Sequence, residues 1–298
     1  MGATPLRFAD GSPVRAASGI APYAGGWLVL QDDATHACVW RDGVGARLRL
    51  FSPVRGHDVF DEASGTKQLK PDLEAVLTLP DGRTLALGSG STPLRMRSVL
   101  LSEASVLVAG LAPLYARVAE ALDIAPELLN LEGACVLGEQ LRWFQRGLPS
   151  SGAPTASVDL PLASLLDLVA GAAAAVSVSG VRRYDLGKVA GVDLAVTDAV
   201  PLPNGDVLVS AVAEDSPSTY HDGPVVGAAL AVLDGDRLVD LAELPLVDGT
   251  VAKVEGVAVA GHDGERLALV AVVDADDPAA PSLLLDLRLS RAPSEGQA

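Results

Sequence analysis

The feature that most constrains the fold of this chain is a five-fold repeat of paired short strands. In each copy an apolar strand begins beside an acidic or hydroxyl residue, turns, and is followed by a second strand that ends in polar residues. A nearly constant period of more than fifty residues, with four short strands in each copy, is typical of a β-propeller. The sequence therefore predicts an all-β, five-bladed β-propeller. By the differences of their residue numbers, successive marker residues are 56, 58, 66 and 57 positions apart; they are Ser18, Glu74, Glu132, Asp198 and Glu255.

The two ends of the chain complete each other in this pattern. The last copy ends after its third strand, near Arg288, and the first seventeen residues hold one more strand, around Pro5. We therefore expect the N-terminal strand to join the last blade, because closing the ring removes sheet edges that would invite aggregation. Six or four blades, a β-sandwich and a pair of small β domains are the alternatives.

The predicted domain organisation is a single β-propeller over residues 1–292, followed by a disordered tail over 293–298. Segments 114–122 and 162–174 interrupt the strand pattern with helix-forming composition and apolar periodicity. We expect both segments to form short helices between strands.

The net charge of −16 limits the partners that this chain can bind. Nucleic acids and anionic membranes need a basic protein surface, so neither is expected as a partner. The longest apolar run, 168–181, is alanine-rich and interrupted by serine, which makes it too weak to span a membrane. No secretion leader is visible, and Cys38 and Cys135 have neither a disulfide framework nor a metal-type spacing. We therefore expect a cytoplasmic monomer.

The marker residues predict a metal site. In a propeller the start of each innermost strand lies at one mouth of the central channel, so the five markers should converge there. Glutamates that face one axis repel each other, and either protonation or a bound cation must relieve the repulsion. An array of oxygen ligands suits Ca²⁺ better than Zn²⁺. The alternative is a structural ring in which the acids cap backbone N–H groups. The expected calcium ligands are Ser18, Glu74, Glu132, Asp198 and Glu255.

A polar loop is expected to overhang the same mouth, because it follows a second strand. It runs from Glu214 to Gly223 and includes Asp215 and His221, the latter beside another aspartate. A histidine next to an aspartate can act as a general base, or bind a phosphate or a sugar. The alternative is a solvated loop whose side chains cap its own turns.

A second stretch has the composition of an anion site. Small residues around Ser89 let backbone N–H groups approach a ligand, and Arg95 and Arg97 follow closely. Arg146 could join them from the next blade. The alternative is that these arginines pair with surface acids. We predict catalytic roles for His221 and Arg146, and ligand-binding roles for Ser89, Arg95, Arg97, Glu214 and Asp215.

At the marker residues the chain resembles the calcium-activated nucleotidases (apyrases), five-bladed propellers with a polar residue from each blade around a central calcium. The segments that begin at Lys253 and Leu202 are especially similar to that family. Short strands of the same type occur in phytase-like and esterase-like propellers, and the stretch 211–224 resembles one in an uncharacterised bacterial propeller family. The resemblance implies a central Ca²⁺, although few basic residues here match the basic mouth of apyrases. The matching positions are Ser18, Glu74, Glu132, Thr197 or Asp198, and Glu255.

Two functions therefore remain open. The first is a metal-dependent hydrolase of a small anionic ester or phosphate bound at the channel mouth, where the metal would polarise the scissile group or activate water. The second is a non-catalytic propeller that binds a small molecule or a protein across the same mouth. The fold alone does not decide between them, because propellers carry many unrelated functions.

Overall fold

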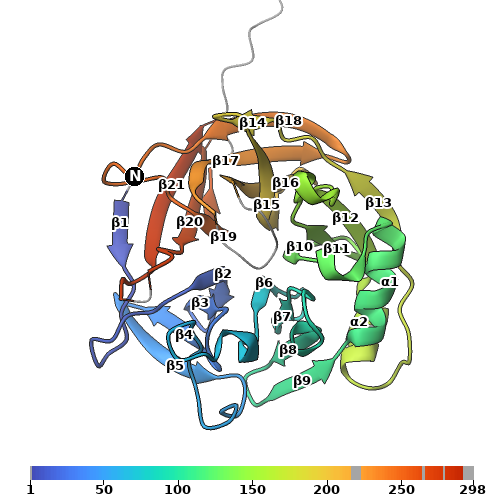
Figure 1. Ribbon diagram of the computed structural model, residues 1–298, viewed down its shortest axis with the longest axis horizontal. Helices are drawn as coiled ribbons and strands as arrows, with labels where there is room; N and C mark the ends of the chain where they lie inside the picture. Colours follow the sequence, from blue (N-terminus) through green and yellow to red (C-terminus); the bar gives the residue numbers. More distant parts are fainter. Residues whose placement is uncertain (1, 216–222, 264–265, 278, 291–298) are drawn as a thin grey trace, which may run out of the picture.

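The computed structural model describes residues 2–215, 223–263, 266–277 and 279–290. Five small antiparallel sheets surround a central axis, as Figure 1 shows. The fold is a five-bladed β-propeller, which confirms the prediction from the repeat. Each repeat alone is too small to bury its apolar faces, so neighbouring blades bury them against each other.

The first three blades contain four strands each, in chain order from the axis outwards. Their strands are β2 (Ala17–Tyr23), β3 (Gly26–Gln31), β4 (His36–Arg41) and β5 (Val44–Arg49); β6 (Leu73–Thr78), β7 (Thr84–Gly88), β8 (Arg97–Leu101) and β9 (Val106–Gly110); and β10 (Leu131–Leu137), β11 (Gln140–Gln145), β12 (Ala156–Pro161) and β13 (Ser179–Arg183).

The fourth blade has a short additional strand beside its innermost one, and the fifth combines the two ends of the chain. The fourth contains β14 (Lys188–Val189), β15 (Val192–Pro201), β16 (Val207–Glu214), β17 (Val225–Asp234) and β18 (Arg237–Glu243), and the fifth β19 (Val254–His262), β20 (Arg266–Val273), β21 (Leu283–Ser290) and β1 (Gly2–Pro5).

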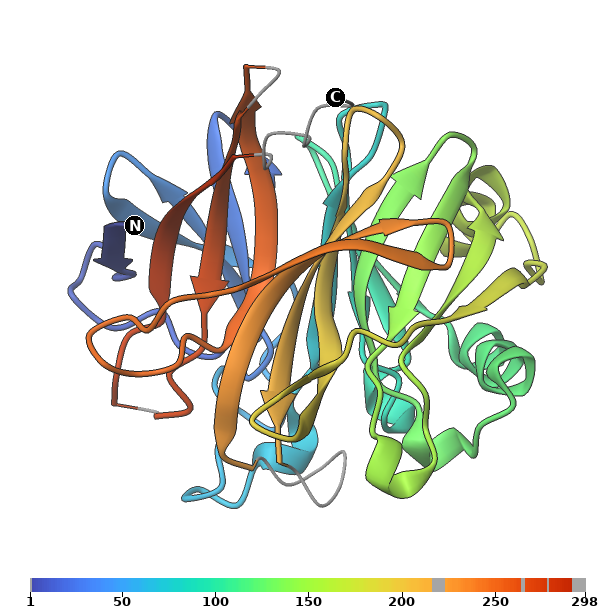
Figure 2. The same ribbon diagram turned by 90° about the horizontal axis from the view of Figure 1, so that it is seen from above.

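The N-terminal strand closes the ring as predicted. Strand β1 pairs antiparallel with β21, the last strand of the chain. Ser282, just before β21, then ties the fifth blade to the first: its carbonyl accepts a hydrogen bond from Leu6 N at 2.9 Å and its hydroxyl accepts one from Ala17 N at 3.1 Å. The side view in Figure 2 shows these end strands standing next to the first blade.

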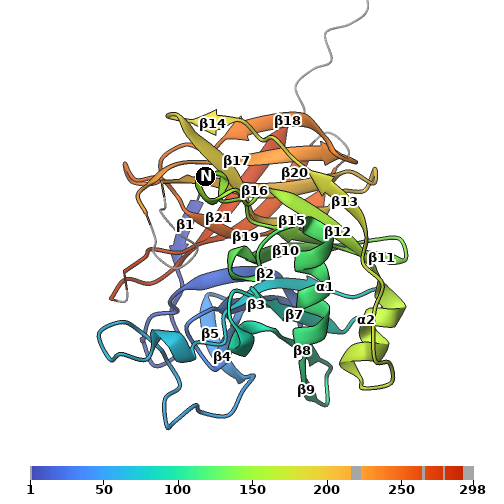
Figure 3. The same ribbon diagram turned by 45° about the vertical axis from the view of Figure 1, so that its right-hand side comes forward.

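Two helices lie outside the ring, where the sequence predicts them. They are α1 (Ala112–Leu122) and α2 (Leu162–Val169), and Figure 3 shows both beside the third blade. Tyr115 on α1 is fully buried against Trp143 of β11, with ring centroids 5.0 Å apart. Among the described residues, no helix is long and apolar enough to cross a membrane. The described residues also form four short 3₁₀ segments: η1 (Lys67–Leu69), η2 (Pro93–Arg95), η3 (Pro126–Leu128) and η4 (Pro149–Ser151).

Each innermost strand has a register shift beside its marker residue, which re-aims the side chain there. In the fourth blade the shift lies between Val196 and Asp198, so the equivalent residue is Thr197. The Thr197 hydroxyl donates to Val254 O at 2.6 Å, just as the Ser18 hydroxyl donates to the next blade at 2.6 Å. The sequence-based choice of Asp198 was therefore wrong by one position.

The innermost strands approach each other closely, and small residues next to the markers permit this. A Cβ atom built on Gly256 of β19 would lie 2.7 Å from the Cα atom of Gly19 on β2. No side chain can occupy that space unless the two strands move apart.

This close approach makes a stability prediction. We expect Gly256→Ala to lower the free energy of unfolding by about 1–3 kcal/mol, because the methyl group overpacks the ring. Gly261→Ala is the matched control, since a Cβ atom there meets nothing within 4 Å and the residue lies on the same strand. Urea denaturation of the two variants measures the difference, and equal losses in both would contradict the packing argument.

Candidate functional site

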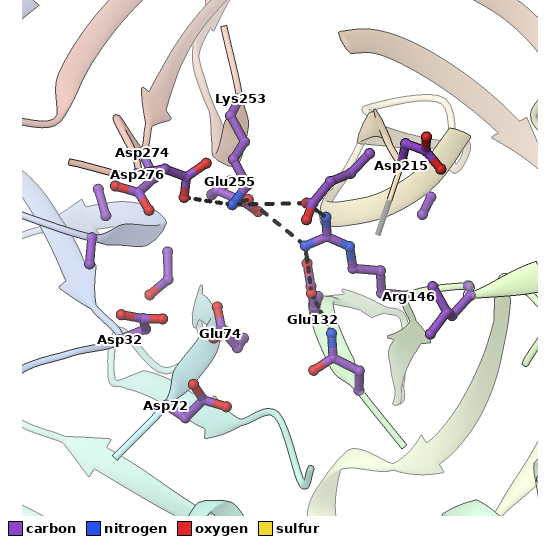
Figure 4. Close-up of a pocket in the computed structure, with 18 of the residues that line it drawn as sticks. Asp32, Asp72, Glu74, Glu132, Arg146, Asp215, Lys253, Glu255, Asp274 and Asp276 are labelled. Carbon is purple, nitrogen blue, oxygen red and sulfur yellow. Dashed lines mark hydrogen bonds and ion pairs between the residues drawn. The ribbon is translucent and has the colours of Figure 1, made fainter. Parts of the chain in front are cut away.

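A cavity of about 300 Å³ lies at the mouth of the central channel, and Figure 4 shows it in close-up. Among the described residues, ten carboxylic acids and five basic side chains line it, and none of the lining residues is Phe, Tyr or Trp. The acids are Asp32, Asp72, Glu74, Glu132, Asp193, Glu214, Asp215, Glu255, Asp274 and Asp276, and the bases are Lys67, Lys70, Arg95, Arg146 and Lys253. The cavity is therefore strongly polar, with twice as many acids as bases.

One backbone hydrogen bond in each of four blades places polar residues side by side at this mouth. The residue that follows the second strand donates its backbone N–H to the carbonyl of the residue two positions before the marker. The pairs are Asp32 to Ala16 at 3.0 Å, Ser89 to Asp72 at 2.9 Å, Arg146 to Asn130 at 2.9 Å and Asp274 to Lys253 at 3.1 Å.

Arg146 connects carboxylates of three blades. Its Nη1 lies 3.0 Å from Glu132 Oε1, and its Nη2 lies 2.7 Å from Glu214 Oε2. Glu255 Oε1 is 3.8 Å from the same guanidinium. Figure 4 shows Arg146 reaching from the third blade towards this group. The guanidinium thus places one positive charge among three carboxyl groups near the axis.

Lys253 supplies a second internal cation. Its Nζ lies 2.9 Å from Asp276 Oδ1 and 3.4 Å from Glu255 Oε1. Glu214 Oε2 is 3.9 Å away. The Lys253 side chain is 9% exposed, so the ammonium depends on these carboxylates in place of water.

A second group of acids lies on the first two blades. One carboxylate oxygen from each of Asp32, Asp72 and Glu74 lies within 4.8 Å of the other two. Lys70 Nζ contacts Asp32 and lies 2.6 Å from Asp72 Oδ1, and Arg95 Nη1 lies 3.0 Å from Asp72 Oδ2. Glu74 is the exception, because no described residue forms a hydrogen bond or ion pair with its carboxyl group.

The acids of the cavity differ in protonation because their surroundings differ. Burial raises the pKa of Glu74 well above its usual value, and the charges of Asp72 and Asp32 raise it further. Burial also acts on Asp72, but the attraction of Lys70 and Arg95 is stronger and lowers its pKa. Glu74 is therefore the protonated acid of this pair and Asp72 the ionised one.

The third-blade marker also holds a proton at neutral pH. Burial raises the pKa of Glu132 to about 8, although the charge of Arg146 acts in the opposite direction. Asn130 Nδ2 donates to its Oε1 at 2.8 Å. Burial raises the pKa of Glu255 as well.

The predicted calcium ligands do not form one cluster. Ser18 lines the cavity, but its hydroxyl donates to a backbone carbonyl. Asp198 is absent from the cavity lining, and its two oxygens accept hydrogen bonds from Ala199 N and Val257 N, both at 2.8 Å. In the described part of the chain, the group of acids spaced to hold a metal is Asp32, Asp72 and Glu74, which contains one of the five predicted ligands.

The predicted ligand-binding residues separate into two sets. Arg95, Glu214 and Asp215 line the cavity. Ser89 lies behind it, fully buried, with its hydroxyl donating to a cavity carboxylate. Arg97 does not line the cavity, and its guanidinium lies 5.4 Å from the centroid of the buried Phe51 ring.

The two predicted catalytic residues also differ. Arg146 lines the cavity at its centre, whereas His221 lies outside the described residues. Sequence reasoning assigned no role to Lys70, Asp72 or Lys253, which the structure places in the cavity. The signal was present, since a polar residue stands two positions before the marker in three repeats.

A family model of unknown function, DUF6910, matches residues 66–278. The chain belongs to the DUF6910 family. This agrees with the prediction of an uncharacterised propeller family, while the resemblance to apyrases stays a prediction. No curated protein sequence matches this DUF6910 member.

Solved structures share the fold of this DUF6910 member at low identity. The mannose phosphorylase MPT-4 from Leishmania mexicana, in complex with phosphate, has a TM-score of 0.51 and 13% identity over 96% of this chain and 88% of that one. An α-L-arabinanase mutant from Cellvibrio cellulosa gives 0.49 and 13% over 96% and 95%. A glycosyl hydrolase from Bacteroides ovatus gives 0.49 and 10% over 94% and 85%. At such identities the likeness concerns the fold alone.

The raised pKa of Glu132 makes the stability of the protein dependent on pH. Between the usual glutamate pKa of 4.5 and the folded value of about 8, the native state keeps a proton that the unfolded state has released. The free energy of unfolding should therefore fall as the pH rises through this window, by at most about 1.4 kcal/mol per pH unit for one group.

Glu132→Gln should reduce this slope, because the amide does not titrate. Urea denaturation at several pH values from 5 to 8 measures it, with Glu103→Gln as an exposed control that keeps the wild-type slope. A wild-type slope in Glu132→Gln would show that this carboxyl is ionised in the native state.

Proposed function

We propose that this protein is a hydrolase of a small, uncharged, hydroxyl-rich molecule that binds in the central cavity. The observation that carries the proposal is the pair Glu74 and Asp72, whose oxygens lie within 4.8 Å of each other. Their surroundings shift the two pKa values in opposite directions. A protonated carboxyl beside an ionised one is the arrangement that acid–base hydrolysis uses.

In this proposal the two carboxyls act in one step. Glu74 donates its proton to the oxygen of the leaving group, and Asp72 accepts a proton from the attacking water. Lys70 and Arg95 hold Asp72 in place and keep it ionised. After product release, a proton passes from Asp72 through solvent to Glu74, which restores the starting state. Glu74 is suited to donate this proton because no described residue forms a hydrogen bond or ion pair with its carboxyl group.

The charge of the cavity supports an uncharged substrate. Each of the five basic side chains that line it has a carboxylate partner: Glu62 for Lys67, Asp32 and Asp72 for Lys70, Asp72 for Arg95, Glu132 and Glu214 for Arg146, and Asp276 for Lys253. A ligand therefore meets mainly carboxyl groups, which accept hydrogen bonds from hydroxyl groups and repel anions. This weakens the sequence-based expectation of an anionic ester or phosphate.

The choice of a first substrate to test follows from the comparison. The enzyme from Leishmania mexicana with the same fold is named for its action on mannose, a neutral and hydroxyl-rich sugar. That likeness extends to the fold only, so the comparison decides which substrate is tested first and nothing more.

The kinetic prediction concerns Glu74. We expect the protein to hydrolyse neutral p-nitrophenyl glycosides, beginning with the mannoside, with a higher kcat/KM than p-nitrophenyl phosphate. Glu74→Gln should lower kcat by a factor of about 10²–10⁴, the usual contribution of a positioned acid, with little change in melting temperature. Glu103→Gln should retain wild-type kinetics. Preference for the phosphate, undiminished kcat in Glu74→Gln, or no turnover of any neutral substrate would reject the proposal.

Calcium binding is a second candidate function for the same acids. Asp32, Asp72 and Glu74 offer hard oxygen ligands that suit Ca²⁺. However, Lys70 already places its ammonium group against Asp32 and Asp72, where a cation would lie. A metal would have to displace this lysine, so we place the acid–base proposal first.

Melting of chelator-stripped protein separates the two candidates. A ligand present at about a hundred times its Kd adds ~2.7 kcal/mol, which raises the melting temperature by a few degrees. With Lys70 in place, we expect no rise in millimolar Ca²⁺ beyond that seen in Mg²⁺. A Ca²⁺-selective rise that Glu74→Gln removes would instead establish the metal site.

A further inference from the structure

A second cavity, of about 450 Å³, lies on the outer side of the first blade. We call it the His36 cleft. Its walls come from three stretches of chain: the loop between β1 and β2, the strands β3 to β5, and the connection from β5 to β6. Figure 1 shows these elements next to one another in the blue part of the ring. The side chains used below are those of Phe8, Arg15, Asp33, His36, Arg47, Arg49, Asp58 and Asp61.

His36 is a buried polar side chain without a partner. It is the first residue of β4, only 7% exposed, and its ring lies 5.6 Å from the ring of Phe8. No described residue forms a hydrogen bond with its ring nitrogens, although its backbone carbonyl accepts one from Gln31 at 3.1 Å. The ring nitrogens are not among the enclosed polar atoms without a partner, so they are open to the cavity that His36 lines, and a ligand there can reach them.

Three arginines of the cleft keep hydrogen-bond donors available. Their terminal nitrogens contact carboxylates: Arg15 meets Asp33 at 2.7 Å, Arg47 meets Asp10 at 2.8 Å, and Arg49 meets Asp58. The Nε–H group of each guanidinium has no partner among the described residues. A guanidinium carries five donors, so one carboxylate does not exhaust it.

The charges nearest His36 are mainly positive. Burial is the largest influence that lowers its pKa, Arg47 and Arg49 lower it further, and Asp58 alone raises it. Of the other acids of the cleft, Asp33 has its pKa raised to about 6 by burial and by the charge of Asp32, with Arg15 acting in the opposite direction. Hydrogen bonds from Ser64 lower the pKa of Asp61, and the charge of Arg15 adds to this effect. The side of the cleft at His36 therefore holds a neutral imidazole and two arginines, of which Arg47 is paired with Asp10 and Arg49 with Asp58.

We propose that the His36 cleft binds a small oxyanion, a phosphate or carboxylate group, between His36, Arg47 and Arg49. The imidazole and the unpartnered Nε–H groups of Arg47 and Arg49 donate hydrogen bonds to the oxygens of the anion, in addition to the contacts of the two guanidinium groups with Asp10 and Asp58. Binding makes the imidazole take up a proton from solvent, because the charged form then has a partner. The site is separate from the central cavity and does not depend on the function proposed for it.

The test uses NMR signals of the four histidines in the full chain, with the His36 signal identified by its loss in His36→Gln. We expect millimolar inorganic phosphate, at constant ionic strength, to raise the pKa of His36 by about one unit while leaving the other histidines unchanged. A parallel titration with acetate distinguishes a carboxylate ligand from a phosphate ligand. If His36 responds to acetate as strongly as to phosphate, the site is a carboxylate site; if the response to acetate is weaker, it is a phosphate site.

Variants separate binding from folding. Arg49→Gln should weaken the phosphate response roughly tenfold, since a charge-assisted contact is lost. Arg237→Gln, which removes the same charge from an exposed pair on the fourth blade, should respond like the wild type. Thermal melting shows whether each variant is folded. The proposal is overturned if His36 responds to neither anion beyond chloride, if all histidines shift alike, or if folded Arg49→Gln keeps the full response.

Discussion

Five strands that converge on one axis impose the constraint on which the rest of this structure depends. Where the innermost strands meet, there is room for one marker side chain from each blade, and the residues next to the marker must be small. Gly256 satisfies this between the first and fifth blades, where a single methyl group would collide with the backbone of Gly19. The bulge beside each marker residue turns the marker side chain out of the ladder.

The same convergence creates an electrostatic problem, because it crowds carboxyl groups into a space that excludes much of the water. Burial penalises every charge there, and the penalty is relieved in two ways. Asp72 is ionised beside Lys70 and Arg95, whereas at Glu132 burial outweighs the charge of Arg146 and the carboxyl keeps its proton. Where pairing is weak or absent, as at Glu74, the carboxyl keeps its proton. A mixture of protonated and ionised acids is thus a consequence of the fold, and it supplies the chemistry that we propose.

The turn after β3 brings the two cavities together in one short segment. Asp32 lines the central cavity and contacts Lys70, whereas its neighbour Asp33 lines the His36 cleft and contacts Arg15. Burial is the main reason that the pKa of Asp33 rises to about 6, and the charge of Asp32 contributes. An anion in the cleft would therefore act on a segment that also shapes the central cavity.

The sequence by itself determined the propeller, its five blades and its closure, because these follow from strand periodicity and turn residues that act locally. It also placed Glu74, Glu132, Glu255, Arg146 and Glu214 at one mouth, since each blade orients its strands in the same way. It could not place Asp198, because a one-residue bulge directs that carboxylate to Val257 N and leaves Thr197 as the equivalent residue. Only the tertiary structure decided which cations meet which acids. Those pairings, such as Arg146 with Glu214, join residues of different blades. The local sequence pattern around each residue contains no information about how far apart the two side chains lie.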